Sequence, residues 1–155
     1  MPKRFLFLLL LLFAQPLTAG SPLVREWSVE RDLDGTYQAV YKALEDNNFF
    51  VVFEVDMQAN LSRFAERWGE DYNRNDLEGI RAMVFCNGWY ANQVSNRDPA
   101  LLVLCPLHLT VIHKAGKSTV QFLRPSHVAR GSAAEAVATE LEAAVVKAIE
   151  QGIAP

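Results

Sequence analysis

The stretch from Leu101 to Ile112 is the most apolar run of the chain outside its N-terminus. In an extended strand, successive side chains point to opposite faces of the sheet. Such a strand needs cover on both sides, so we expect helices over one face and a second copy of the chain over the other. Pro106 interrupts the run and marks a strand edge, a bulge or the true start of the strand. The two faces carry Cys105, Leu107, Leu109 and Val111 on one side and Leu104, His108, Thr110 and Ile112 on the other.

Shorter β-rich runs and amphipathic helical segments occupy the rest of the chain, with a hairpin turn expected at 114–117. This order of elements predicts an α+β fold, in which helices pack on one face of a mainly antiparallel sheet. Asp34 or Thr36 is the expected cap of the first helix, and Ser132 that of the last. We expect further strands at 23–30, 49–55, 80–86 and 118–122, and helices at 36–46, 58–68, 89–94 and 132–151.

The segment from Met1 to Gly20 has the pattern of a secretory signal peptide. Lys3 and Arg4 precede an apolar run from Phe5 to Ala14, and Pro16 and small residues follow it. The run has ten residues, whereas a helix that spans a bilayer needs about 20. The pattern therefore predicts a cleaved signal peptide, with an uncleaved N-terminal anchor as the alternative.

Cleavage is expected after Ala19 or Gly20, which leaves residues 21–155 as a single periplasmic domain with no membrane segment. Two basic side chains leave with the signal peptide, so 13 of the 15 remain against 18 acidic ones and the formal charge moves from -3 to -5. A chain with this charge is unsuited to nucleic acid, which requires a basic surface. Export also places the cysteines in an oxidising compartment, where a disulfide persists.

Three short motifs resemble the domain-of-unknown-function 302 (DUF302) family over roughly residues 34–130. The resemblance implies a TATA-binding-protein-like α+β fold that is often paired as a dimer, and it implies no settled activity. Cys86, Gly88 and His108 stand where the family often has glycine, proline and arginine, so a role tied to that arginine does not carry over. The motifs are Phe53-Glu54-Val55-Asp56 for the family's strand-to-helix junction, Val84-Phe85-Cys86-Asn87-Gly88 for its Phe-Gly-Asn-Pro turn and Leu104-Cys105-Pro106-Leu107-His108 for its Leu-Pro-Leu-Arg strand.

Cys86 and Cys105 are the two cysteines of the chain. A disulfide that closes a loop of about 20 residues stabilises a domain by roughly 3 kcal/mol, which favours a bond between them in a small exported protein. Two buried free thiols and a ligand role are the alternatives. The spacing is not C-x-x-C, which argues against a thioredoxin-type dithiol.

Cys105 and His108 form a C-x-x-H pattern. Thiolate and imidazole suit zinc, copper or haem iron. Residues three apart in a strand point to opposite faces, so the two side chains meet only if Pro106 makes a bulge. The C-x-x-C-H motif for covalent haem attachment is absent. We therefore predict no cofactor, and a metal or haem at this pair is the alternative.

Three residues are candidates for ligand binding. Asn87 precedes Gly88 in an expected turn, and its side-chain amide can bind a ligand. Glu54 interrupts an apolar strand and is a buried acid with a raised pKa, a side chain that points outward, or the partner of an arginine. Trp89 can line a ligand pocket, although aromatic residues at helical spacing more often belong to a core.

A short basic cluster follows the last expected strand. Arg124, His127 and Arg130 flank this loop and can hold an anion, although solvated loop charges are the usual explanation.

The sequence has no G-x-S-x-G, H-E-x-x-H or P-loop motif. We therefore expect an exported, non-enzymatic protein that binds a small ligand or a periplasmic partner protein and works as a homodimer. The alternative is a periplasmic redox, metal or haem protein that uses Cys86, Cys105 and His108.

Overall fold

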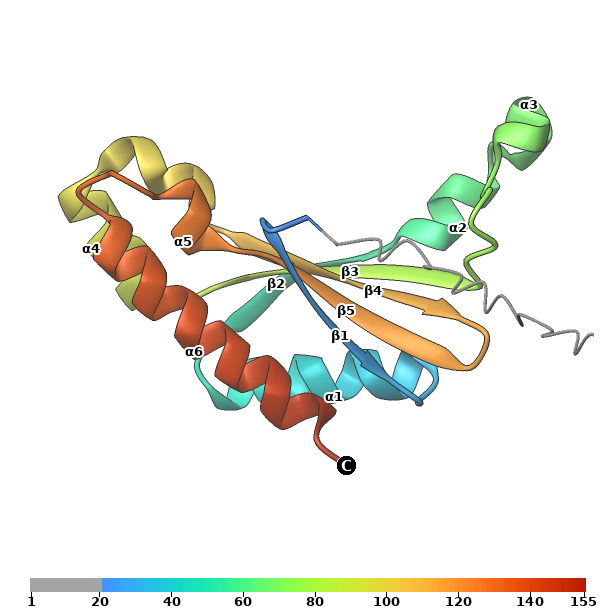
Figure 1. The fold of residues 1–155 in the computed structure, drawn as a ribbon, viewed down its shortest axis with the longest axis horizontal. Coiled ribbons are helices and arrows are strands. Elements are labelled where there is room, and N and C mark those ends of the chain that lie inside the picture. The colour runs from blue at the N-terminus through green and yellow to red at the C-terminus, as the bar shows by residue number, and fades with distance from the viewer. Residues whose placement is uncertain (1–20) are drawn as a thin grey trace, which may run out of the picture.

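Five antiparallel strands form one sheet in the order β1-β5-β4-β3-β2. A computed structural model describes residues 21–155, and the expected signal peptide lies outside the described residues. The antiparallel sheet with its helices confirms the α+β expectation (Figure 1). The strands are β1 (Val24–Val29), β2 (Phe50–Asp56), β3 (Gly79–Cys86), β4 (Leu107–Lys114) and β5 (Lys117–Leu123).

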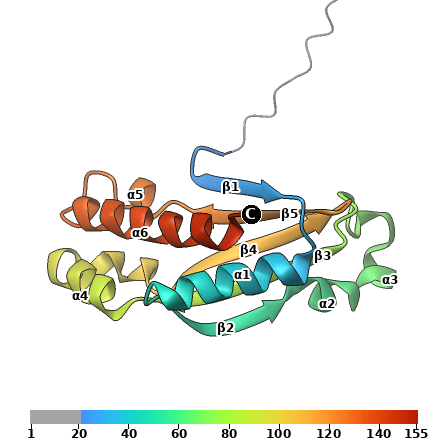
Figure 2. The ribbon, with the colours of Figure 1, turned by 90° about the horizontal axis from the view of Figure 1, so that it is seen from below.

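Two long helices, α1 (Leu33–Asp46) and α6 (Glu135–Ile153), lie side by side on one face of the sheet (Figures 1 and 2). They approach so closely at the end of α6 that a Cβ at Gly152 would lie 2.7 Å from the carbonyl oxygen of Ala39. Only glycine permits this distance. The shorter elements, which lie toward the two ends of the sheet, are α2 (Met57–Ser62), α3 (Ala65–Trp68), η1 (Gly69–Asp71), α4 (Gly88–Arg97), η2 (Pro99–Leu104) and α5 (Pro125–Val128).

The hydrophobic core lies between this face of the sheet and the two helices. Burial alternates along β4 as the sequence predicts, with Leu107, Leu109 and Val111 buried against the helices and His108 exposed on the other side. The Tyr37 hydroxyl of α1 donates a hydrogen bond to the carbonyl oxygen of Ala82, 3.2 Å away. The largest fully buried side chains include Tyr37, Phe49, Phe85, Phe122, Leu44 and Met83.

The strand expected over 101–112 is wrong in its first half. Residues 99–104 form the 3-10 helix η2, and β4 begins only at Leu107. Asp98 starts η2, because its carboxylate accepts a hydrogen bond from the backbone N–H of Ala100. Pro106 has no N–H to donate to a ladder, so the pairing with β3 begins one residue later.

The continuous helix expected over 58–68 is also wrong, because the chain breaks it into α2 and α3 around Arg63 and Phe64. No residue of α2 or α3 is buried, so the apolar stripe of this segment has no core to pack on. Phe64 and Trp68 instead stack on each other, with ring centroids 5.0 Å apart. The two short helices form an arm that projects from one end of the sheet (Figure 1).

The expected helix caps are displaced. Asp32, rather than Asp34 or Thr36, caps α1, since its carboxylate accepts a hydrogen bond from the N–H of Gly35 at 2.6 Å. The Ser132 hydroxyl accepts a hydrogen bond from the backbone N–H of Ala134 at 3.2 Å, but α6 itself begins later, at Glu135.

The buried carboxylate of Glu142 ties α6 to the segment that follows β5. Its Oε1 accepts a hydrogen bond from Nε of Arg124 at 2.8 Å, and its Oε2 accepts from the backbone N–H of Ser126 at 3.2 Å and from the Ser126 hydroxyl. Burial by itself raises the pKa of Glu142, but the hydrogen bonds from Ser126 and Arg124 outweigh it and hold that pKa below its usual value.

We predict that Glu142→Gln lowers the free energy of unfolding at neutral pH by roughly 1–3 kcal/mol, because it replaces a carboxylate that accepts charge-assisted hydrogen bonds. The folded-state pKa is lowered, so this contribution is present above the unfolded pKa of about 4.3 and is lost as the pH falls through the folded value. Denaturant unfolding of both proteins at several pH values measures this contribution to the free energy of unfolding. Glu140→Gln, at an exposed position of the same helix, is the control, and a stability gap for Glu142→Gln that persists undiminished in acid contradicts the account.

Candidate functional site

Among residues 21–155, no helix lies across the face of the sheet opposite α1 and α6 (Figure 1). We call it the open face. The α2–α3 arm stands at one end and α4, η2 and α5 stand at the other. By register and alternation, its side chains are Val24, Glu26 and Ser28 from β1, Thr119, Gln121 and Leu123 from β5, His108, Thr110 and Ile112 from β4, Ile80, Ala82, Val84 and Cys86 from β3, and Phe50, Phe53 and Val55 from β2.

A β-bulge makes the β2 edge of the open face unusually apolar. Val51 pairs with Phe85 and Phe53 with Val84, so Val52 has no partner in the register. The extra residue shifts the alternation, which keeps both Phe50 and Phe53 on the open face. Phe50, Val52 and Phe53 are 55 %, 63 % and 61 % exposed. The result is a row of large apolar side chains in contact with water at one edge of the sheet.

The opposite edge of the open face is polar and internally hydrogen bonded. Nε2 of Gln121 donates to the carboxylate of Glu26 at 2.7 Å, and the hydroxyls of Ser28 and Thr119 lie 2.8 Å apart. A shallow depression of about 320 Å³ lies beside these residues and extends to His108. The open face therefore has an apolar half on β2 and β3 and a polar half on β1 and β5.

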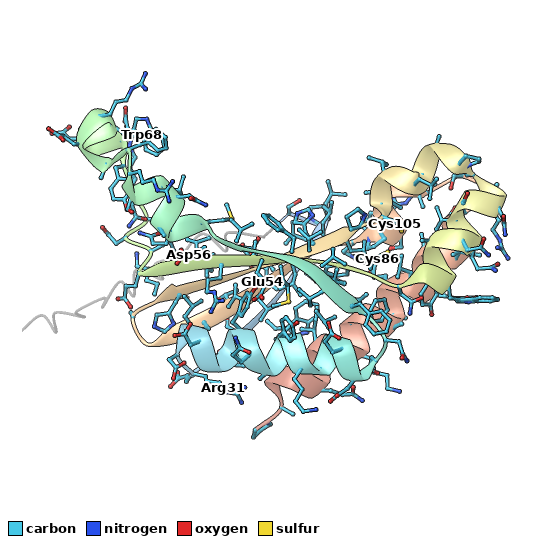
Figure 3. All side chains as sticks on the ribbon, turned by 180° about the vertical axis from the view of Figure 1, so that it is seen from behind. Arg31, Glu54, Asp56, Trp68, Cys86 and Cys105 are labelled. Carbon is cyan, nitrogen blue, oxygen red and sulfur yellow. The ribbon has the colours of Figure 1, made fainter. Side chains whose placement is uncertain are left out.

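Cys86 and Cys105 come together at the η2 end of the open face (Figure 3). Cys86 is the last residue of β3. Cys105 lies between η2 and β4, and β4 is the neighbour of β3 in the sheet. Burial raises the pKa of the Cys105 thiol to about 11, and Cys86 adds to the rise through its charge and a hydrogen bond. The structure records both as free thiols. The expected pairing of these two residues in space is present, and the disulfide itself stays a prediction.

His108 shares the open face with the thiol pair, since it lies opposite Val84, two residues before Cys86 on β3. Across residues 21–155, no three His, Cys, Asp or Glu side chains gather in a way that holds a metal ion. The C-x-x-H pair of Cys105 and His108 therefore gains no third ligand from that part of the chain.

Asn87 has a structural role at the start of α4. Its Oδ1 accepts hydrogen bonds from the backbone N–H groups of Trp89 at 3.0 Å and Tyr90 at 3.2 Å, and its Nδ2 donates to the carbonyl oxygen of Asn48 at 3.0 Å. The side-chain amide that the sequence offers to a ligand is thus committed to the protein. Trp89 is 66 % exposed in the first turn of the same helix.

Glu54 lies on the helix side of the sheet, because the bulge at Val52 turns it away from the open face. Its carboxylate is 3.7 Å from the guanidinium of Arg81, which also pairs with Asp34 at 2.9 Å and lies 3.8 Å from the centre of the Tyr37 ring. Burial raises the pKa of Tyr37, and a hydrogen bond and charge from Glu54 raise it further. Glu54 is therefore the partner of an arginine and is separated from the thiol pair by the sheet.

The comparisons with known proteins agree with this architecture. The family described as "Domain of unknown function DUF302" matches residues 25–152. Among solved structures, the "uncharacterized conserved protein DUF302 from Bacillus stearothermophilus" superposes with a TM-score of 0.71 at 15% sequence identity, and the match covers 84% of this chain and 98% of that one. At this identity the likeness shows the fold alone. No curated protein matches the sequence.

Proposed function

The chain belongs to the DUF302 family, and we propose that this member is an exported, non-enzymatic binding protein that works as a homodimer joined across its open face. The observation that carries the proposal is the exposure of Phe50 and Phe53, with Val52 exposed at the bulge between them, on a face that no helix of residues 21–155 crosses. Large apolar side chains gathered on one surface are typical of an interface. A second copy of the chain removes them from water without any further component.

The charge of the open face suits a contact between two acidic chains. The whole sequence has a formal charge of -3, so two copies repel each other over most of their surfaces. Among the strand residues on the open face, Glu26 carries the one carboxylate, and Gln121 donates a hydrogen bond to it. Two open faces can therefore meet without bringing unpaired carboxylates together.

The size of the open face also suits a dimer. Five strands with neighbours ~4.8 Å apart, each about seven residues long at ~3.3 Å per residue, make a face of roughly 20 by 23 Å. This projected area of about 460 Å² is of the same order as the ~800 Å² per partner of a standard interface.

The N-terminal residues support export, since a basic start, a short apolar run and small residues are what a secretory signal requires. Between residues 21 and 155, no helix has the length and apolarity to cross a bilayer.

We predict that Phe53→Glu weakens the dimer at least about tenfold, because it removes an apolar contact worth roughly 1.5–3 kcal/mol and places a carboxylate in the interface. Sedimentation of the mature chain over a range of concentrations measures the association. Gln38→Glu adds the same charge at an exposed position of α1, on the far side of the sheet, and should associate as the unaltered chain does. A mature chain that stays monomeric at all concentrations contradicts the homodimer, and equal weakening by both variants contradicts the choice of face.

Export makes a separate prediction. A full-length precursor expressed in a Gram-negative bacterium should yield a periplasmic product whose mass starts at Gly20 or Ser21, because Ala19 and Gly20 are the expected cleavage points. Leu9→Arg, which charges the apolar run, should leave the product uncleaved inside the cell, whereas Leu9→Val should be processed normally. An uncleaved product of the unaltered precursor in the membrane fraction supports an anchor instead.

A second candidate function is a periplasmic thiol protein, and the placement of Cys86 beside Cys105 favours it. Oxidation of the two thiols forms one S–S bond and gives up two protons and two electrons, which an oxidant such as oxidised glutathione accepts. The raised pKa of Cys105 keeps its thiol protonated at neutral pH, so oxidation should accelerate with increasing pH.

We predict that oxidised glutathione yields a chain two hydrogens lighter than the reduced form, and that the bond raises stability by roughly 3 kcal/mol. Cys86→Ser and Cys105→Ser should each abolish the mass change, which controls for oxidation elsewhere. A stable mixed disulfide with glutathione at one cysteine, in place of the internal bond, means that the two thiols do not reach each other.

A further inference from the structure

A shallow cavity of about 300 Å³, open to solvent and lined by several charged side chains, lies on the helix side of the sheet, away from the open face. The start of β1, the segment around α5 and the N-terminal half of α6 surround it (Figure 2). Its volume equals that of about ten water molecules at ~30 Å³ each. It lies on the opposite side of the sheet from the thiol pair and from the face of the proposed dimer.

Both carboxylates in this cavity accept hydrogen bonds from donors of the protein. Both oxygens of Glu142 are occupied, one by Arg124 and the other by Ser126. The carboxylate of Glu135 accepts a hydrogen bond from the backbone N–H of Gly131 at 2.7 Å. These two acids therefore offset only part of the positive charge that the arginines bring to the cavity.

The cavity holds more cationic donors than these acids use. Neither Arg25 nor Arg130 has a carboxylate within 4.0 Å among residues 21–155. The guanidinium of Arg25 lies 5.8 Å from the centre of the Trp27 ring, a cation–π distance that holds it near the start of β1. His127 lines the same cavity. Three arginines thus face two carboxylates, in a protein whose overall charge is -3.

We propose that this cavity binds a small oxoanion, such as phosphate or sulfate, between Arg25, Arg124 and Arg130. Planar guanidinium groups present pairs of N–H donors whose spacing matches the oxygens of a phosphate or sulfate. Arg124 is held in place at the edge of the cavity by two protein acceptors, since its Nε donates to Glu142 at 2.8 Å and its Nη1 donates to the carbonyl oxygen of Pro22 at 3.5 Å. The same chemistry recognises a free oxoanion and a phosphate group on a larger molecule.

Isothermal titration calorimetry of the mature chain tests the site, with inorganic phosphate, sulfate and glycerol phosphate as probes and chloride added to keep the ionic strength constant. We expect saturable binding of phosphate or sulfate, weakened about tenfold or more by Arg25→Gln and by Arg130→Gln. The affinity of Arg130→Lys for the anion should lie between those of the unaltered chain and Arg130→Gln, since lysine keeps the charge and loses the paired donors. Lys147→Gln removes a charge from an exposed position of α6 outside the cavity and should bind as the unaltered chain does.

The same titrations distinguish the two sources of the anion. Tighter binding of glycerol phosphate than of inorganic phosphate identifies a phosphate group on a larger molecule, and the reverse order identifies a free oxoanion. Arg25 and Arg130 are exposed, so their substitution should leave the fold intact, which circular dichroism of each variant checks. The proposal is overturned if no probe gives more heat than chloride, or if both glutamine variants bind phosphate as tightly as the control.

Discussion

A five-stranded sheet has two faces, and the two long helices of this chain lie on the same one. This one-sided cover is the constraint on which the other features depend. The helix side becomes the core, where Tyr37, Phe85 and Phe122 are buried. Apolar surface left in water costs about 25 cal/mol per Å². The other side is polar along β1 and β5, and along β2 it exposes the phenylalanines that the proposed dimer would cover.

Much of the fold follows from patterns that the sequence carries locally. The alternation along 107–112 predicts that Leu107, Leu109 and Val111 share one face of β4, and the structure confirms this grouping. Elements whose form depends on a distant partner are less predictable. The stripe over 58–68 is amphipathic, yet it meets no core and breaks into two short helices. The apolar residues at 101–104 have a strand-like composition, but Pro106 prevents their pairing and Asp98 starts a 3-10 helix instead.

The candidate site shows the same division. The meeting of Cys86 and Cys105 follows from the antiparallel pairing of β3 with β4, which places the end of β3 beside the segment that leads into β4. The separation of Glu54 from that site follows from a single unpaired residue, Val52, which no local pattern marks. That one-residue shift moves Phe53 to the open face and Glu54 to the helix side. The sequence shows the basic residues after β5 as a cluster. The cavity that they line is also formed by residues of β1 and α6, which are distant from them in the sequence.

The bulge thus links the local structure of β2 to the proposed function, because it exposes the apolar row that a second copy would cover in the proposed dimer. The most direct measurement is the effect of a soluble paramagnetic agent on the methyl NMR signals of the reduced, mature chain at low and high protein concentration. The account predicts that the methyl groups of Val52, Val55 and Ile80 lose access to the agent as concentration rises, while those of exposed alanines on α6 such as Ala136 and Ala143 keep it. Unchanged access at Val52 and Val55, or protection that arises on α6 instead, would contradict an interface on the open face.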